Sequence, residues 1–327
     1  MNRVSSIMVM PEETHLRLDR WFKRHFPALS HGRLEKLLRT GQVRVDGRRV
    51  RAGERLVPGQ SVRVPPLGEA ADQPPQHERP KVTAQDAEDM RALVIHRDDE
   101  VIAINKPPGL AVQGGTGTDR HVDGMLDALR FGSKERPRLV HRLDRDTSGV
   151  LVLARTAVAA AWLGEAFRQR DARKIYWAVT AGVPKPRRGK IDLALDKQAS
   201  PRGERVAVDA DGGRRAVTLY DVVDAAGQKL AWIAFMPLTG RTHQLRVHAQ
   251  ALGTPILGDG KYGGADAIPG GAGLSKKLHL HARSLVLPRP GKQPLRLEAP
   301  LPRHMAATWQ LFGWSEAGFV DEFPDDD

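Results

Sequence analysis

The densest group of side chains capable of chemistry occupies residues 141–149, HRLDRDTSG. Two arginines, two aspartates and a histidine fall within its first six residues. Neighbouring cations keep a carboxylate ionised, and an ionised carboxylate such as Asp144 can act as a nucleophile or a base. The alternative, which is favoured for an Asp/Arg cluster considered alone, is a structural ion-pair network at a turn, because Asp-Thr-Ser-Gly is an ordinary turn sequence.

A second group is formed by His279 and His281, which are two residues apart in an alternating segment. On a strand such residues share a face, as metal ligands can. Together with His141, Asp144 and Asp146 they give the hypothesis of a metal-dependent hydrolase. Packed histidines are the favoured alternative, since no carboxylate lies beside the pair in the sequence.

Other common chemistries lack their signatures. The chain contains no cysteine, which excludes disulfides, cysteine nucleophiles and thiolate zinc sites. The glycine-rich segment 114–117 is not followed by the Lys-Ser/Thr of a phosphate-binding loop. Neither a Gly-x-Ser-x-Gly elbow nor a dinucleotide-binding Gly-x-Gly-x-x-Gly after a strand is present. Common cofactor chemistry is therefore disfavoured.

The charge of the chain points to a polyanionic partner. The formal net charge is +12 over 327 residues. Residues 14–64 hold 13 Lys and Arg against four Asp and Glu, so this short segment carries +9 of that charge. A generally basic proteome does not predict such concentration, whereas a nucleic-acid-binding module does.

This basic segment has the pattern of a small separate domain at 14–65. Leu16 to Phe26 give one apolar helical face, and a second helix with Leu34, Leu37 and Leu38 follows Ser30 as a candidate N-cap. Asp46-Gly47 is a hairpin-turn pair between apolar strands. The segment 66–91 is rich in proline and is predicted to be a linker.

The large segment 92–320 combines strand and helix patterns without regular alternation. It is therefore predicted to be a mixed α+β domain rather than a doubly wound fold. The expected elements are a hairpin at 92–104, a helix at 157–167, and strands at 150–154, 175–179, 232–235 and 278–288. The glycine-rich segment 258–273 is predicted to be a mobile loop, and the acidic tail 321–327 to be frayed.

No targeting segment is expected. The first residues contain only a four-residue apolar stretch, which is too short for the core of a signal peptide, and no run approaches 18 apolar residues. These features, with the absence of cysteine, give the expectation of a soluble cytoplasmic protein.

Several motifs together resemble the RluA-type family of pseudouridine synthases. They are NKPPG (105–109), HRLDRDTSG (141–149), KIYWA (174–178), GRTHQLRVHAQALGTPILGD (240–259) and LHLHA (278–282), in the family's order. The resemblance covers about residues 92–305. The segment 14–64 resembles an S4 RNA-binding domain, and this pairing is most similar to the RluC-like enzymes of large-subunit ribosomal RNA.

The resemblance implies a fold and an activity. The fold would be α+β, with a mixed, mainly antiparallel sheet in the catalytic domain of pseudouridine synthases and a small N-terminal α/β S4-like RNA-binding domain. The activity would be the isomerisation of uridine to pseudouridine in large-subunit (23S) ribosomal RNA, by an aspartate-dependent reaction with base flipping and no cofactor or metal. The partner would be ribosomal RNA, with no membrane, and the chain would be a monomer.

The resemblance also assigns roles to individual residues. Asp144 matches the catalytic aspartate, and Arg246 resembles the arginine that pairs with it. Tyr176 resembles the tyrosine that stacks on the target uracil, and it could also assist removal of the C5 proton. Arg142 resembles the arginine that fills the gap left by the flipped uridine. Lys106 is expected to support the active-site floor or to contact RNA. The RNA contacts expected from the basic segment are Arg17, Arg20, Arg33, Lys36, Arg39, Arg44, Arg48 and Arg49.

A second function stays open beside the enzyme. A non-catalytic RNA-binding or ribosome-assembly protein would need the same basic segment and could use a synthase-like domain as a binding platform. The discriminating feature is the complete set Asp144, Tyr176 and Arg246, which a binding protein has no chemical need to keep.

Overall fold

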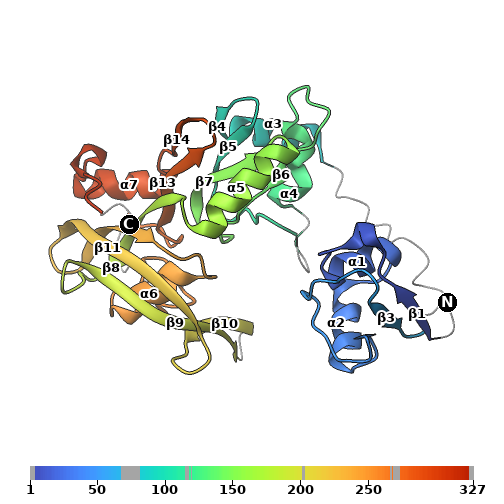
Figure 1. Cartoon of the computed structure of the whole chain (residues 1–327). Coiled ribbons are helices and arrows are strands. Elements are labelled where there is room, and N and C mark those ends of the chain that lie inside the picture. The colour runs from blue at the N-terminus through green and yellow to red at the C-terminus, as the bar shows by residue number, and fades with distance from the viewer. Residues whose placement is uncertain are drawn as a thin grey trace. The chain divides into compact units, whose positions relative to one another are not determined.

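The computed structural model forms two compact units, residues Met1–Arg79 and Pro80–Asp327 (Figure 1). It describes residues 4–67, 82–114, 118, 120–200, 203–265, 267 and 273–323. Within these ranges, no helix is long and apolar enough to cross a membrane.

The first unit is a three-stranded sheet covered by two short helices. Its elements are β1 (Ser5–Met8), η1 (Pro11–Glu13), α1 (Leu18–His25), α2 (His31–Arg39), β2 (Arg44–Val45) and β3 (Ser61–Val64), with strand order β1-β3-β2. The predicted apolar face of α1 is buried, and the Ser30 side chain caps α2 by accepting from the Arg33 amide. Asp46 and Gly47 both have positive φ, as the predicted hairpin turn requires.

The predicted boundaries of this unit were wrong at both ends. Strand β1 lies before residue 14 and pairs antiparallel with β3, so it belongs to the unit. Leu67 is buried in the same apolar core, so the unit also extends past residue 65. A short sequence such as β1, with alternating exposure, has too little apolar character to be recognised without its partner strand.

The predicted linker 66–91 is also partly wrong. Residues 84–92 form helix α3 (Ala84–Ala92), in which the Thr83 side chain accepts from the Asp86 amide and Asp86 reaches back to Thr83. This reciprocal capping fixes the first turn, and Met90 anchors the helix in the core of the second unit. Residues 68–81 of the predicted linker lie outside the described residues.

The second unit is built on one large sheet. The path of hydrogen-bonded strands is β10-β9-β11-β12-β8-β13-β7-β5-β4, with β14 beside β13 and β6 beside β7. The strands are β4 (Val94–Arg97), β5 (Val101–Lys106), β6 (Arg138–Leu139), β7 (Ser148–Ala154), β8 (Arg173–Ala181), β9 (Arg188–Ser200), β10 (Gly203–Val208), β11 (Arg214–Ala226), β12 (Leu230–Pro237), β13 (Leu280–Arg289) and β14 (Lys292–Glu298). Among the described pairs only β7 with β13 is parallel, so the predicted α+β fold with a mainly antiparallel sheet is confirmed.

Helices cover both faces of this sheet (Figure 1). They are α4 (Val122–Met125), η3 (Leu126–Leu129), α5 (Ala157–Gln169), α6 (Gln244–Ala251), α7 (Arg303–Phe312) and η4 (Glu316–Gly318). The predicted helix at 157–167 and the predicted hairpin and strands are confirmed as α5, β4–β5, β7, β8, β12 and β13. The strands of 188–226 and the helix α6 were not predicted.

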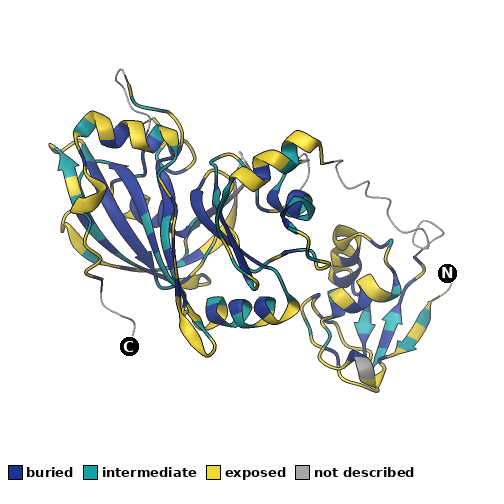
Figure 2. Ribbon diagram, turned by 90° about the horizontal axis from the view of Figure 1, so that it is seen from above, coloured by how far each residue is buried: buried dark blue, intermediate teal, exposed yellow. Residues whose placement is uncertain are grey.

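Side chains along β8 alternate between an apolar core on one face of the sheet and the face on which α6 packs. Ile175, Trp177 and Val179 point into a core that also contains Trp232 and Trp309 of α7. Tyr176 and Ala178 point to the opposite face, where α6 packs. Figure 2 shows that the central strands are buried along most of their length.

The start of the acidic tail is docked rather than frayed. Arg173 of β8 contacts the Asp321 carboxylate at 2.6 Å and donates to the Phe323 carbonyl oxygen at 2.9 Å, and the Phe323 side chain is buried. The prediction of a frayed tail is therefore wrong for residues 321–323. Residues 324–327 lie outside the described residues.

His279 and His281 are packed histidines, which confirms the favoured alternative to a metal site. The two ring nitrogens of His279 bond the Lys277 carbonyl oxygen and the Thr308 hydroxyl. Those of His281 bond the Ser148 hydroxyl and the Ala299 carbonyl oxygen. Burial lowers the pKa of each ring to about 4.

The depressed pKa values of these histidines predict a stability that depends on pH. Between about pH 4 and pH 6.5 the unfolded chain binds protons that the folded chain excludes, so stability should fall as pH falls through this window. Each ring can contribute up to about 1.4 kcal/mol per pH unit. Urea unfolding followed by tryptophan fluorescence measures this, since five of the six tryptophans lie in the second unit.

His281→Gln is the variant that isolates one ring. It should make the dependence of unfolding free energy on pH shallower between about pH 5 and 6.5, because one proton-binding difference is removed. An unchanged slope would show that His281 does not carry the effect.

Candidate active site

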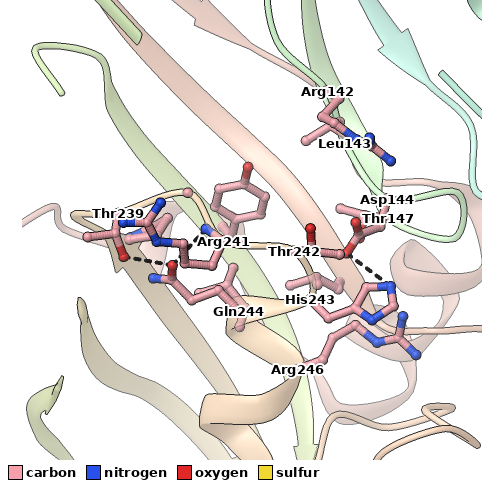
Figure 3. A pocket seen from close by; sticks show the side chains of 15 residues that line it. Arg142, Leu143, Asp144, Thr147, Thr239, Arg241, Thr242, His243, Gln244 and Arg246 are labelled. Carbon is pink, nitrogen blue, oxygen red and sulfur yellow. Dashed lines mark hydrogen bonds and ion pairs between the residues drawn. The ribbon is translucent and has the colours of Figure 1, made fainter. Parts of the chain in front are cut away.

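A cavity of about 140 Å³ opens on the second unit beside Asp144 (Figure 3). It is formed where the 141–149 turn, strand β8, the end of β12 and the beginning of α6 meet. The residues that matter for its chemistry are Arg142, Asp144, Tyr176, His243, Gln244 and Arg246. The structure therefore brings together the four predicted residues Arg142, Asp144, Tyr176 and Arg246.

Close strand packing fixes the turn that carries Asp144. Gly149 follows this turn in β7 and has φ of +111°. A Cβ atom there would collide with the carbonyl oxygen of Ala282 on β13, so only glycine allows the two strands to approach this closely. Asp144 accepts a backbone hydrogen bond from the Thr147 amide at 3.2 Å, and its side chain is half-buried at the cavity.

Lys106 supports the same turn, and its side chain is not exposed to a ligand. Its side chain is fully buried, and its ammonium group donates to the carbonyl oxygens of Pro107, Leu110 and Arg145, each at 2.9 Å. Burial lowers the pKa of Lys106 to about 7, against the opposing attraction of Asp146 and Asp144. The prediction of an RNA contact is thus wrong, whereas a role in the floor of the site fits the geometry.

The predicted pairing of Arg246 with Asp144 was also wrong. The guanidinium of Arg246 forms a bidentate ion pair with Asp259, with both N–O distances at 2.7 Å, and both side chains are buried. Burial disfavours the charged guanidinium, but the hydrogen bonds of Asp259 outweigh it and raise the pKa of Arg246. Asp144 attracts this charge only through space.

Asp259 and Tyr262 were missed because they lie in the segment 258–273, predicted to be a mobile loop. In the described beginning of that segment Asp259 and Tyr262 are instead buried, and Asp259 accepts from the amides of Lys261 and Tyr262 at 3.1 and 3.0 Å. The guanidinium of Arg246 also lies over the Tyr262 ring, 4.9 Å from its centroid. The feature of the sequence that could have revealed the partner of Arg246 was the acidic residue directly after Gly258.

His243 lies beside the Asp144 carboxylate and was not predicted. Its Nε2 lies 4.0 Å from an Asp144 oxygen, and its Nδ1 shares a 2.7 Å hydrogen bond with the Tyr262 hydroxyl. In the view of Figure 3 its ring lies between Asp144 and Arg246. Burial lowers the pKa of His243 although Asp144 opposes this, so the ring is neutral near pH 7. It begins α6 with φ of +54°, which is rare for a residue with a side chain.

Gln244 anchors the beginning of α6. Its carbonyl oxygen accepts from the Thr239 hydroxyl at 2.7 Å and the Arg241 amide at 3.0 Å, while its amide nitrogen donates to Val217 and Thr218 of β11, each at 2.9 Å. A buried amide with all these groups satisfied fixes the helix against the sheet. It thereby sets the direction of His243 and Arg246.

Tyr176 and Arg142 occupy the cavity in different ways. Tyr176 is half-buried on β8, and burial followed by the charge of Asp144 raises the pKa of its hydroxyl, which stays protonated. Arg142 is exposed at the cavity and belongs to the turn before β7. The aromatic ring and the planar cation are therefore both available to a planar ligand.

The predicted RNA-binding residues of the first unit differ in their surroundings. Arg20, Lys36, Arg39 and Arg49 are exposed. The others are also involved in contacts within the unit: Arg17 with Asp19, Arg48 with Glu54, Arg33 with the Leu67 carbonyl oxygen, and Arg44 with the carbonyl oxygens of Gly41 and Gly47. Arg44 is half-buried, so its main contacts hold the hairpin rather than face solvent.

The hypothesis of a metal site has no support in the geometry. His141 accepts from the Val152 amide through Nε2 at 2.8 Å and stacks on Phe167. Burial lowers the pKa of His141 to about 3. The described part of the chain contains no group of three His, Asp or Glu placed to hold a metal ion.

Removing one partner of the buried ion pair should destabilise the second unit strongly. Asp259→Asn leaves the buried Arg246 charge without a counter-charge, and a loss of about 3–5 kcal/mol in unfolding free energy is expected. The exposed pair Arg215–Asp192 is the matched control, and Asp192→Asn should cost less than about 1 kcal/mol. Equal losses in urea unfolding would contradict the importance given to the buried pair.

Comparisons with known proteins agree with this fold and site. Residues 100–251 match the family described as RNA pseudouridylate synthase. The chain is 37% identical over 295 residues to ribosomal large subunit pseudouridine synthase C of Rickettsia typhi, covering 88% of this chain and 94% of the relative. It is 35% identical to the mitochondrial RNA pseudouridine synthase 4 of Arabidopsis thaliana, covering 89% of this chain and 78% of that protein.

Solved structures give the same result. The structure of human RNA pseudouridylate synthase domain containing 4 has a TM-score of 0.58 and 31% sequence identity, and the match covers 69% of this chain and 95% of that one. The sequence relationship thus covers nearly the whole length of the bacterial relative and more than three quarters of the plant one. On these grounds the chain belongs to the RluA-type family of RNA pseudouridine synthases, enzymes that isomerise uridine in RNA.

Proposed function

We propose that this chain converts specific uridines of large-subunit ribosomal RNA to pseudouridine, with Asp144 as the catalytic carboxylate. The observation that carries the proposal is the position of Asp144, half-buried in a small cavity with Tyr176 and beside the neutral His243. The choice of ribosomal RNA rests on the names of bacterial relatives that match over nearly their full length.

The reaction requires no redox partner. The N1–C1′ bond of the uridine breaks, the uracil turns within the site, a C5–C1′ bond forms, and the proton on C5 is lost while N1 regains one. Asp144 can act in either of two ways: it attacks C1′ to form a covalent intermediate, or it takes the C2′ proton to give a glycal. Both need a carboxylate beside the ribose, which Asp144 supplies.

The uracil needs a surface on which to turn. Tyr176 offers an aromatic ring on the cavity wall, on which the uracil can stack. The target must first leave its helical stack, which costs a few kcal/mol. Arg142 is exposed beside Asp144, so its planar guanidinium can occupy the vacated space.

We infer that the first unit is an S4-like anchor that raises the affinity for RNA. It has its own apolar core, and its residues 14–64 carry +9 of the formal net charge of +12. Such contacts to phosphates are largely independent of sequence and depend strongly on salt.

The test of the catalytic assignment is Asp144→Asn. This variant should lose pseudouridine formation by at least about 10²-fold while it still binds RNA, because the amide cannot serve as nucleophile or base. Pseudouridine is measured by mass spectrometry of large-subunit ribosomal RNA incubated with the purified chain. Asp99→Asn, at an exposed turn residue, is the control and should keep full activity.

Two results would contradict the proposal. An active Asp144→Asn variant would remove Asp144 from the chemistry. A wild-type chain that binds RNA but modifies no uridine in ribosomal or transfer RNA would favour the binding protein instead.

The test of the anchor is deletion of residues 1–79. The truncated chain should bind RNA more weakly, and the slope of log Kd against log salt should fall by about 0.7–0.9 for each phosphate contact that is lost. Fluorescence anisotropy over a range of salt concentrations measures both. The same affinity and slope in the truncated and full-length chains would exclude the first unit as the main electrostatic anchor.

A further inference from the structure

A second and larger cavity continues from the catalytic one. Its volume is about 530 Å³, and it shares His243 and Arg246 with the catalytic cavity. Its other charged lining residues are Asp146, Lys261, Lys276 and Lys277. Asp144 and Asp146 therefore stand on one turn, with Asp144 in the first cavity and Asp146 in the second.

The sizes of the two cavities suit different parts of an RNA strand. Cavities that enclose a whole small ligand usually measure about 300–1,000 Å³. The catalytic cavity, at about 140 Å³, suits a base but not the flanking sugar and phosphate groups. The second cavity lies within the usual range for a whole small ligand.

The charge of the second cavity is positive. Lys276 and Lys277 stand against the single carboxylate of Asp146, because the charge of Arg246 is already balanced by Asp259. Lys276 and Lys277 are exposed, and neither has an ion-pair partner in the described part of the chain. Their charges are thus free to act on a ligand.

The fold holds the two lysines in place. A Cβ atom at Gly258 would collide with the backbone of Lys277, so the segment with Asp259 and the segment with the lysines pack directly together. The Lys277 carbonyl oxygen also bonds the buried ring of His279 at 2.8 Å. The backbone under the lysines is therefore fixed to the same structure that positions Arg246.

We propose that this second cavity binds the phosphodiester backbone next to the target uridine, with Lys276 and Lys277 each contacting a phosphate. The inference rests on the proposed function, since it takes the first cavity as the place of the target base. A lysine ammonium group is a compact point charge, so it can bind a phosphate in different backbone geometries. Such a contact does not depend on the bases that flank the target uridine.

The full-length double variant Lys276→Gln/Lys277→Gln tests the proposal by RNA binding. Loss of two phosphate contacts should lower the slope of log Kd against log salt by about 1.4, which corresponds to about tenfold weaker binding at 0.15 M salt. The KM for RNA should rise, while kcat at saturating RNA should stay near the wild-type value. The control is Lys134→Gln/Lys229→Gln, which removes the same charge from two exposed lysines of the same unit outside both cavities.

A lysine-reactivity footprint on the wild-type chain locates the contact. Bound ribosomal RNA should protect Lys276 and Lys277 from an amine-reactive reagent and leave Lys134 and Lys229 reactive. The proposal is overturned if the two double variants have the same salt slope, or if RNA leaves Lys276 and Lys277 unprotected. Neither measurement requires turnover, so a failure of the proposed activity, seen as no pseudouridine from the wild-type chain, is separate from a failure of this inference.

Discussion

The buried ion pair between Arg246 and Asp259 is the interaction on which the geometry of the site depends. Burying two charges costs free energy that is offset only when the remaining hydrogen-bonding groups are satisfied. Asp259 accepts both guanidinium bonds and two backbone amides, one of them from Tyr262, and the Tyr262 hydroxyl bonds His243. Helix α6 and the segment after Gly258 are thereby held together, and both the catalytic cavity and the lysine-lined cavity are built against them.

The second constraint is the alternation of side chains in the sheet. Along β8, Trp177 contributes to the tryptophan core on one face, while Tyr176 reaches the catalytic cavity on the other. Packing on the far face therefore holds the backbone that positions Tyr176. Lys106, at the end of β5, also positions a residue of the catalytic cavity. Its three hydrogen bonds to carbonyl oxygens connect the loop after β5 to the turn that carries Asp144.

The charged residues next to the site differ in role because they differ in burial. Lys106 and Arg246 are buried and satisfied by protein groups, so their contribution is the shape of the site. Arg142, Lys276 and Lys277 are exposed and available to a ligand. Burial thus decides whether an arginine or lysine supports the structure or is available to bind a ligand, because a buried charge must find its partners within the protein.

The sequence by itself determined the local features: the apolar faces of α1 and α2, the Ser30 cap, the strands β7, β8 and β13, the packed histidines, and the motifs of the family. These depend on residues close in the chain, whose spacing directly reflects helix or strand geometry. Only the tertiary structure decided which carboxylate Arg246 pairs with, that Lys106 is buried, that His243 faces Asp144, and that β1 and the beginning of the acidic tail are docked. A sequence presents Asp144 and Asp259 as equal candidates for one guanidinium. The choice belongs to the fold, since an ion pair requires atoms within a few ångströms and complete hydrogen bonding around the buried charges.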